Sequence, residues 1–471
     1  MAEIVVTGGG VAGLSASMLL AEAGHDVTLL ERDAAEPPAP AEAWEAWERR
    51  GVNQFRLLHF FMPRFRIALE QELPQVAKAL EAAGALRFSL IGEVPVAVSG
   101  GERPGDDDFS SLTARRPVLE SVMGIAAAST PGVTVRRGVA VAGLVAGAQA
   151  IRGVPHITGV RTAAGEEIPA DLVVDATGRR SALPDWLESA GACRPVEELE
   201  DSGFVYYGRH FRSADGTTPV ALGPGLQAYG SVSTLTLPAD NGTWGVGVIA
   251  SAADKALRGL RDVDQWSSVV RSLPLAAHWL DGEPIEDRVV TMSKIEDRHR
   301  SFTVDGAPVA TGVVAVADSW ACTNPSLGRG ASIGMMHCLA LRDLLGTTGI
   351  DDPAAFTAAW AQATESVVEP WYRATLSFDR HRLGEIDAEI QGVAYRPEGD
   401  DWNIVKSIFF AAGQDPDCLR AALSIQTLLG TPDEVFADAA LFEKALTLGA
   451  GWRDAPPLGP SRSDLLSIVA A

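Results

Sequence analysis

The 471-residue chain has few cysteines and no long uncharged apolar run. Its four cysteines form no C-x-x-C pair, which argues against a disulfide framework and a zinc site. We therefore expect no metal centre and a reducing, cytoplasmic location. No uncharged stretch reaches the roughly 18 residues of a transmembrane helix, and no signal-peptide pattern precedes the first apolar strand. The sequence therefore predicts a protein without a transmembrane segment.

Positive charge is also scarce, since 39 Lys and Arg residues face 61 Asp and Glu residues, for a net charge of −22. This excess of negative charge argues against nucleic acid and anionic membrane surfaces as partners. Hydrophobic residues make up 46% of the chain, enough for a large core in two or three domains. The composition is typical of a soluble, enzyme-sized protein.

Residues 4–32 predict a strand, a glycine-rich turn, a helix and a second strand that ends in an acid. Gly8, Gly10 and Gly13 fit G-x-G-x-x-G. The first glycine permits a tight turn, the second lets the backbone approach a pyrophosphate, and the third lets the helix pack close to the strand. The helix N-terminus offers free N–H groups to phosphates. Glu31 stands near the spacing at which a carboxylate binds ribose hydroxyls. The segment therefore predicts a site for FAD or NAD rather than NADP.

Two later segments repeat the pattern of a buried strand that ends in an acid and is followed by a glycine turn. The apolar run of residues 170–181 ends at Asp175, and that of residues 313–332 ends at Asp318. In open α/β sheets, ligands bind at the carboxyl ends of the parallel strands. A helix beginning near residue 331 would add the positive end of its dipole to the second segment. Both segments are therefore candidates for a nucleotide site.

The pattern changes between residues 204 and 292 to strand-like runs, which predict a mostly antiparallel sheet that lies over a cofactor. Residues 226–237 are expected to form one such run. Residues 65–83 have the period of a single helix, and the chain from residue 353 onward is largely helical. The sequence thus predicts a β-rich insertion between two parts of a nucleotide-binding domain.

Several aromatic residues are candidates for a substrate pocket, with ordinary core burial as the alternative for each. No Ser/His/Asp triad and no metal-ligand cluster is visible in the sequence, so we assign no acid or base residue. His59 and His210 are retained as catalytic candidates only. The candidate pocket residues are Phe60, Phe61, Tyr206, Tyr229, Trp244 and Trp320.

Three nucleotide-type segments around a β-rich insertion do not fit an NAD dehydrogenase. They resemble the FAD-dependent monooxygenases of the para-hydroxybenzoate-hydroxylase fold. In that family the acid that matches Asp318 binds the ribityl chain, although here Ala317 replaces a glycine. Backbone N–H groups of the stretch matching Pro325 and 328–330 face the flavin pyrimidine edge, and Arg116 resembles an arginine that leads into an FAD-contacting helix. The residues expected to bind FAD are Gly8, Gly10, Val11, Ala12, Gly13, Glu31, Arg32, Gln54, Arg116, Asp175, Asp318, Pro325, Gly328, Arg329, Gly330 and Ala331.

This resemblance implies an α/β fold in which a Rossmann-like FAD-binding domain carries an inserted β-sheet domain and a helical C-terminal region. The expected division is a first FAD-binding part over 1–200, a β-rich substrate domain over 201–295, a second FAD-binding part over 296–350 and a helical region over 351–471.

The motif from Asp175 to Ser181 differs from the Asp-Gly pair of aromatic hydroxylases. It looks like the squalene-epoxidase-like polyether epoxidases of polyketide pathways, and so do residues 50–54, 184–191 and 324–330. The resemblance implies insertion of one oxygen atom from O2, by epoxidation or hydroxylation, into a hydrophobic secondary metabolite through a flavin C4a-hydroperoxide. Electrons would come from NADPH or NADH, directly or through a separate flavin reductase.

Two other flavoenzyme classes stay open as alternatives. A flavin-dependent reductase of prenyl double bonds, similar to geranylgeranyl reductases, would not need O2 for turnover. A flavin-dependent halogenase would carry a Trp-x-Trp-x-Ile-Pro motif and an active-site lysine. The stretch around Trp244 does not match that motif, and Lys78 lies on a predicted helix. The halogenase is therefore the less favoured of the two.

Overall fold

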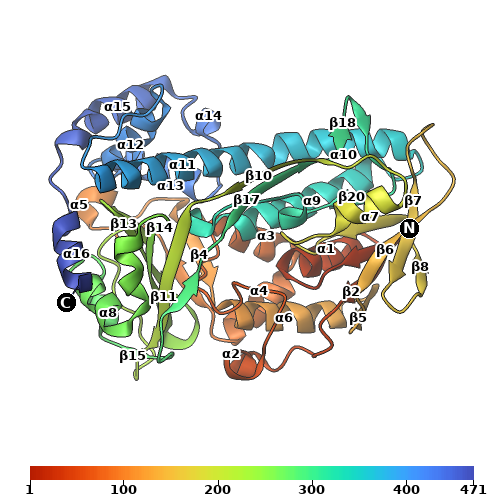
Figure 1. Ribbon diagram of the computed structural model, residues 1–471, viewed down its shortest axis with the longest axis horizontal. Coiled ribbons are helices and arrows are strands. Elements are labelled where there is room, and N and C mark those ends of the chain that lie inside the picture. Colours follow the sequence, from red (N-terminus) through yellow and green to blue (C-terminus); the bar gives the residue numbers. More distant parts are fainter. Residues whose placement is uncertain (471) are drawn as a thin grey trace.

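A five-stranded parallel sheet forms the centre of one half of the computed structural model, which describes residues 1–470 (Figure 1). The strand order β20-β9-β1-β2-β5 brings distant segments of the chain together, and all four pairings are parallel. The strands at positions β20, β9 and β1 are buried on both faces, as their apolar β-branched residues predict, whereas the edge strand β5 is only partly buried. The five strands are β1 (Glu3–Thr7), β2 (Asp26–Glu31), β5 (Val133–Arg137), β9 (Leu172–Asp175) and β20 (Val313–Ala315).

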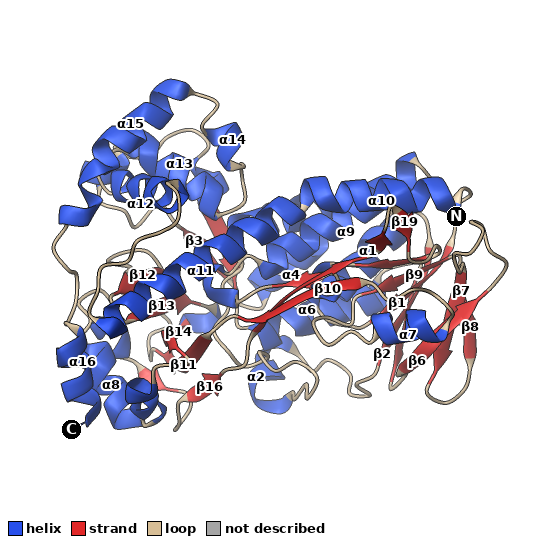
Figure 2. Ribbon diagram, turned by 45° about the horizontal axis from the view of Figure 1, so that its top comes forward, coloured by secondary structure: helices blue, strands red, loops and turns tan. Residues whose placement is uncertain are grey.

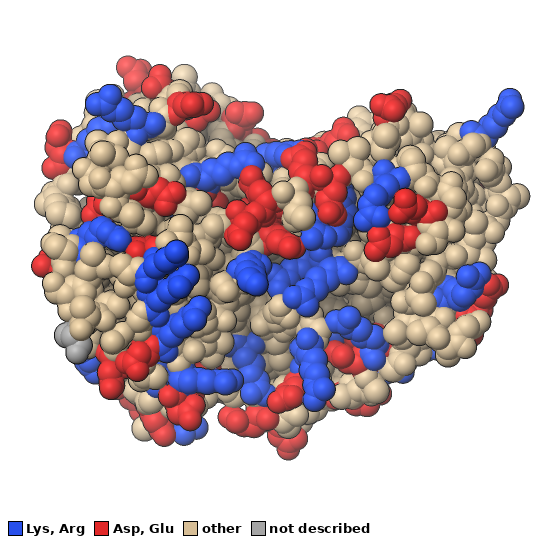
Figure 3. All heavy atoms as spheres, viewed as in Figure 1, with Lys and Arg blue, Asp and Glu red and all other residues tan. Residues whose placement is uncertain are grey.

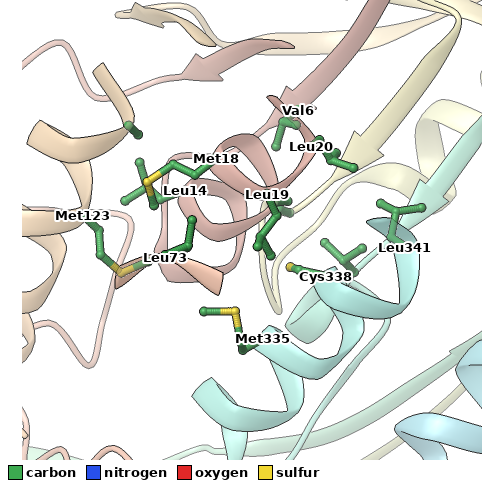
Figure 4. Packing of buried hydrophobic residues seen from close by; sticks show 14 of the residues in the cluster. Val6, Leu14, Met18, Leu19, Leu20, Leu73, Met123, Met335, Cys338 and Leu341 are labelled. Carbon is green, nitrogen blue, oxygen red and sulfur yellow. The ribbon is translucent and has the colours of Figure 1, made fainter. Parts of the chain in front are cut away.

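One face of this sheet is covered by helices, of which α1 and α9 pack against each other (Figure 4). Leu14 and Leu19 of α1 share a core with Val6 of β1 and with Met335 and Leu341 of α9. This packing fixes both helices against the sheet. The helices on this face are α1 (Val11–Glu22), α3 (Pro63–Glu72), α4 (Pro74–Ala82), α6 (Arg116–Ser129), α9 (Gly330–Thr347) and α10 (Pro353–Val367).

The opposite face of the parallel sheet is covered by a small antiparallel sheet and a short helix. Val5 and Val173 of the parallel strands share a second core with Ile157, Val160 and Leu187 from this layer. The chain therefore has the three layers of an α/β domain with both sheet faces covered. The layer consists of β6 (Val141–Ala146), β7 (Ile157–Thr162), β8 (Glu167–Pro169) and α7 (Leu183–Ser189).

A six-stranded sheet forms the second half of the molecule, in the order β12-β13-β14-β11-β15 with β16 beside β11. Helices α8 (Val263–Arg271) and α16 (Arg462–Ala470) cover one face, with Trp266 and Leu465 in its core. Helix α11 (Glu369–Gln391) lies on the other face through Ile386. The strands are β11 (Phe204–Arg212), β12 (Leu226–Tyr229), β13 (Val232–Pro238), β14 (Thr243–Ser251), β15 (Glu283–Pro284) and β16 (Val290–Met292).

Two long elements connect the halves. Strands β10 and β17 form an antiparallel ribbon with β21, and α11 runs alongside them from α10 toward the second sheet (Figure 2). The ribbon strands are β10 (Val196–Asp201), β17 (Glu296–Ser301) and β21 (Ala321–Cys322), and the C-terminal helices are α12 (Asp401–Ala412), α13 (Pro416–Gln426), α14 (Pro432–Val435) and α15 (Ala439–Gly449). The remaining short elements are α2 (Ala43–Ala46), β3 (Leu86–Ser89), α5 (Val96–Ser99), β4 (Ser110–Thr113), β18 (Thr303–Val304) and β19 (Ala307–Pro308).

Two sequence-based expectations about single elements are wrong. The helix expected over 65–83 is two helices, because Pro74 disfavours helical geometry in the residue before it, and Leu73 has φ −134° and ψ 56°. The run expected over 226–237 is a hairpin, in which Gly230 has a φ of +47° and forms the turn.

Within residues 1–470, no helix combines the length and the apolar character needed to cross a bilayer. No three His, Cys, Asp or Glu side chains of that range converge on a point where a metal ion would bind. All four cysteines are free thiols.

Candidate active site

The carboxyl ends of the parallel strands open into a cavity of about 1000 Å³ that reaches the antiparallel sheet. Its first half is lined by residues 8–12 of the glycine turn, by 177–180 after β9, and by the loop between β20 and α9. Its second half is lined by β11 to β13, residues 220–226, and helices α12 and α13. One continuous cavity therefore joins the predicted nucleotide segments to the inserted sheet.

The three glycines of the first turn have different surroundings. Gly8 has a φ of +98°, and a Cβ there would lie 2.6 Å from the carbonyl oxygen of Ala176. A Cβ on Gly13 would lie 1.8 Å from the carbonyl oxygen of Gly8. Gly10, in contrast, lines the cavity, and a Cβ there would meet no atom within 4 Å. Gly8 and Gly13 therefore shape the turn, and Gly10 leaves room for a ligand.

Two helix N-termini open into the first half of the cavity. Helix α1 begins after Gly10 and helix α9 after Arg329, and no side chain caps either start. The N–H groups of a first helical turn have no intrahelical partner, and they carry the positive end of the helix dipole. The open Gly10 position and these amides fit the pyrophosphate of a dinucleotide such as FAD.

Three arginines reinforce the positive potential of this region. Arg32, Arg179 and Arg180 line the cavity, and none of them forms a salt bridge with another residue of the described chain. Figure 3 shows Lys and Arg side chains gathered in the middle of the viewed face of a protein whose net charge is −22. The sequence analysis included Arg32 but missed Arg179 and Arg180, although both directly follow the second glycine turn.

Glu31 lines the cavity and is almost fully buried. Its carboxylate accepts hydrogen bonds from the backbone N–H of Gly9 at 2.8 Å and of Asp33 at 2.8 Å. It also pairs with the Arg49 guanidinium at 2.5 Å. The carboxylate thus fixes the glycine turn. A contact to the ribose of a bound nucleotide stays a prediction.

Arg49 begins a buried charge network that sequence reasoning missed. Besides Glu31, it pairs with Glu120 of α6, whose other oxygen pairs with Arg116 at 2.5 Å. Glu120 is fully buried, and the two arginines hold its pKa below the ordinary value in spite of that burial. Arg49 and Arg116 therefore compensate the charges of Glu31 and Glu120 together. The only sign of this charge network in the sequence is an acid within the apolar part of helix 116–129.

His59 is neutral at physiological pH. Its Nδ1–H donates to the carbonyl oxygen of Leu57 at 2.9 Å, so its Nε2 is free to accept, and an Arg116 guanidinium nitrogen lies 3.4 Å from it. Burial and the positive charge of Arg116 lower the pKa of His59 to about 3. His59 lines the cavity, but it has no proton to donate there.

Asp318 follows β20 and lines the same half of the cavity. No described residue donates a hydrogen bond to its carboxylate. Burial raises its pKa, against the opposing influence of Arg116 and Arg179. Asp318 is partly exposed to the cavity, and a hydroxyl-bearing ligand there would supply the hydrogen-bond donor that its carboxylate lacks.

Asp318→Ala is expected to weaken FAD binding by roughly 10- to 150-fold, the scale of a hydrogen bond to a charged group. The same change should leave the unfolding temperature of the FAD-free protein unchanged or raise it, because it removes a carboxylate that lacks a protein partner. Fluorescence titration with FAD and thermal unfolding measure the two effects. Asp343→Ala, on the exposed side of α9, is the matched control. Unchanged FAD affinity would contradict the role of Asp318.

Three of the predicted cofactor residues do not line the cavity. Asp175 is buried, and Thr7, Thr177 and Ser181 donate hydrogen bonds to its carboxylate, so it holds the turn after β9. Arg329 turns away to donate to carbonyl groups of α13. A direct cofactor contact of the Asp175 side chain is therefore wrong, whereas the contact through the backbone N–H of Arg329 stays a prediction. Gly13 packs beneath the turn, where a Cβ would meet the carbonyl oxygen of Gly8. The predicted residues that do line the cavity are Gly8, Gly10, Val11, Ala12, Glu31, Arg32, Gln54, Arg116, Asp318, Pro325, Gly328, Gly330 and Ala331.

Three of the predicted substrate residues lie on the antiparallel sheet, with Tyr206 on one face and Tyr229 and Trp244 on the other. Tyr229 and Trp244 belong to the core beneath α8, so the prediction that they line the pocket is wrong. His210 does not line the cavity either, because it pairs with Glu286 at 2.8 Å. Side chains alternate between faces along a strand, and the register cannot be read from the sequence. The candidates that do line the cavity are Phe60, Phe61, Tyr206 and Trp320.

Known proteins share parts of this sequence and the fold of this chain. A family described as an FAD binding domain matches residues 1–45. The protein Rv3254 of Mycobacterium tuberculosis is 26% identical over 356 residues, which cover 72% of this chain and 72% of that protein. The FAD binding domain family therefore matches the part of the chain that contains β1, the glycine turn and β2.

Two solved structures share the fold. A variant of HpxO from Klebsiella pneumoniae, in complex with FAD, superposes with a TM-score of 0.59 at 15% identity, over 92% of this chain and 100% of that one. The anhydrotetracycline hydroxylase OxyS from Streptomyces rimosus gives a TM-score of 0.56 at 18% identity, over 91% and 76% of the two chains. The predicted α/β fold, with its Rossmann-like FAD-binding core and inserted antiparallel sheet, is confirmed.

Proposed function

We propose that this FAD-dependent oxidoreductase, which has the para-hydroxybenzoate-hydroxylase fold, is a monooxygenase that inserts one oxygen atom from O2 into an apolar small molecule. The observation that carries the proposal is the single cavity, whose first half fits FAD and whose second half is apolar. A cofactor bound at the glycine turn would extend toward a pocket that takes the substrate.

When bound and reduced, FAD would supply the two electrons that activate O2, of which one atom is transferred to the substrate and the other leaves as water. The chain binds and orients this cofactor through the amides at the starts of α1 and α9 and through Asp318. Apolar side chains around the second half, among them Leu226, Leu235 and Leu423, exclude water from the reaction. The chain thus orients the cofactor and keeps water away from the reaction.

The lining favours a substrate that needs no deprotonation. His59 is the only histidine among the described residues of the cavity wall, its pKa of about 3 makes it a weak base, and no lysine accompanies it. Epoxidation of an alkene needs no base acting on the substrate, whereas phenol hydroxylation does. The likeness of residues 175–181 to polyether epoxidases supports the same choice. We therefore propose epoxidation of a hydrophobic secondary metabolite, with hydroxylation as the second reaction of the same class.

An anaerobic titration of the FAD-loaded protein with NADPH and with NADH tests the source of electrons. We expect one of the two to bleach the flavin absorption band within seconds if the protein reduces its own FAD. Reduction by dithionite alone would identify a two-component enzyme that depends on a separate flavin reductase.

Admission of O2 then tests the class of reaction. We expect reoxidation with incorporation of one atom of labelled O2 into an apolar alkene, followed by mass spectrometry. Turnover that proceeds without O2 and saturates the double bond would identify a reductase similar to geranylgeranyl reductases and would contradict the proposal.

A further inference from the structure

A cluster of buried acids lies beside the cavity, where β11, β17 and α11 meet the loop before α9. Asp379 of α11 is 2% exposed, and Asp297 of β17 is 3% exposed. Neither forms a salt bridge with any residue between 1 and 470. Buried carboxylates are costly unless they are paired or protonated. The proposed function uses neither group, so their presence needs another explanation.

Hydrogen bonds connect this cluster to the cavity wall. Ser326, which lines the cavity, donates from Oγ to Oδ1 of Asp379 at 2.6 Å. Tyr206, also in the wall, donates to the amide oxygen of Asn324 at 2.6 Å. The second oxygen of Asp379 and the amide nitrogen of Asn324 are both buried without a partner. One oxygen of Asp379 therefore accepts from a cavity hydroxyl, and the Asn324 side chain is a second group near this carboxylate that favours its ionised form.

The charged and titratable groups that face Asp379 come from three elements. They are Asp297 of β17, Arg329 at the start of α9 and Tyr206 of β11. Burial raises the pKa of Asp379 to about 7, Asp297 adds to the rise, and Ser326 and Arg329 oppose it. Burial also raises the pKa of Asp297 to about 6 and that of Tyr206 well above its ordinary value. Asp379 and Asp297 therefore form a coupled pair of acids that takes up protons near neutral pH, and Tyr206 stays protonated.

Ser326 belongs to the cofactor half of the cavity. It lies between Asp318 and Gly330 in the loop that joins β20 to α9, and all three residues line the cavity. Helix α9 packs on α1, so this loop faces the same space as the glycine turn. A hydrogen bond from the Ser326 hydroxyl into the cavity would therefore reach the bound cofactor.

We propose that Asp379 and Ser326 form a proton-linked switch for the hydrogen bonding of bound FAD. When Asp379 is ionised, the Ser326 hydroxyl donates to its Oδ1. When Oδ1 takes up one proton from solvent, the new O–H donates to Ser326 Oγ, and the serine hydroxyl turns to donate to an acceptor atom of the cofactor. No other bond changes. Asp379 is a positioning residue that acts through Ser326.

The test is a pH titration, from pH 5.5 to 8.5, of the visible absorption band of bound FAD and of FAD affinity. We expect a one-proton transition near pH 7, with FAD affinity roughly 2- to 10-fold higher on the acid side, the scale of one neutral hydrogen bond. Both readouts depend on FAD binding alone, so they are independent of whether the protein is a monooxygenase.

Two variants should abolish the transition in opposite ways. In Asp379→Asn, the amide N–H donates to Ser326 as the protonated acid would, so the spectrum and affinity should keep their low-pH values throughout. In Ser326→Ala, no hydroxyl can donate to the cofactor, so both should keep their high-pH values. A merely structural role of the two residues would not produce opposite fixed states.

Asp297→Asn is the matched control, because Asp297 is equally buried but accepts from the backbone N–H of Asn324 at 2.7 Å. The transition should persist there and shift to lower pH, since a like charge near Asp379 has been removed. The proposal is overturned if the wild-type protein shows no transition, if the transition survives in Asp379→Asn, or if it disappears in Asp297→Asn.

Discussion

Gly10→Val is expected to give a folded protein that no longer holds FAD. A Cβ at Gly10 meets no protein atom within 4 Å, so the fold tolerates a side chain there. The valine would project into the cavity at the start of α1, where the cofactor pyrophosphate approaches the backbone. We expect FAD affinity to fall by at least about 100-fold, which corresponds to about 2.7 kcal/mol. Absorption spectroscopy of the purified protein and FAD titration measure the loss.

Gly346→Val is the control for this substitution. Gly346 also has open space around it, but it lies on the exposed side of α9, away from the cavity. Both variants should keep the circular dichroism spectrum of the wild type, and only Gly10→Val should be colourless. A yellow Gly10→Val protein with normal FAD affinity would refute the assignment of the glycine turn.

Glu120→Ala is expected to lower the free energy of unfolding of the FAD-free protein by about 3–5 kcal/mol, because breaking a buried ion pair leaves an uncompensated buried charge. Glu120 is fully buried and pairs with both Arg49 and Arg116. The alanine would leave Arg116 without a carboxylate partner and would weaken the hold of Arg49 on the glycine turn. Urea denaturation measures the change.

Glu166→Ala is the matched control, since Glu166 also pairs with an arginine, Arg136, but at the surface. The loss of unfolding free energy in Glu166→Ala should be far smaller than in Glu120→Ala. The effect of Glu120 should also depend on pH. Its pKa is lowered in the folded protein, so its stabilisation is present above the unfolded-state pKa and is lost as the pH falls through the folded-state pKa. Equal losses in the two variants would show that the buried network is not a major source of stability.

The features predicted correctly from the sequence are those that depend on local chemistry. The positive φ of Gly8 and the contact between Gly13 and the carbonyl oxygen of Gly8 both lie within one strand–turn–helix unit, so the spacing of these glycines contains the information. Asp175 and Asp318 show the limit of such patterns, because both follow a parallel strand. Only Asp318 is free to bind, since the hydroxyls that follow Asp175 within its own turn occupy its carboxylate. The sequence pattern places both acids at the carboxyl edge of the sheet. Whether each acid is free to bind a ligand depends on its side-chain partners.

Features that depend on distant pairing could not be predicted. Arg49 and Glu120 meet only because α6 packs beside the glycine turn, and neither residue belongs to a motif. Tyr229 and Trp244 were assigned to the pocket because aromatic residues in a β-rich domain are plausible pocket residues. Their actual side of the sheet follows from pairing, in which Trp244 lies opposite Phe211. A shift of one residue would have reversed that outcome.

The position of α16 has a consequence for the biogenesis of the protein. Leu465 and Val469 complete the apolar core under the strands of residues 204–292, and Arg462 pairs with Asp254 at 2.6 Å. While the chain is being made on the ribosome, that sheet emerges long before the helix that closes it. The part of its apolar core that α16 covers stays exposed until residues 462–470 have been translated, although α8 already lies on the same face, and in that interval a chaperone would have a surface to bind.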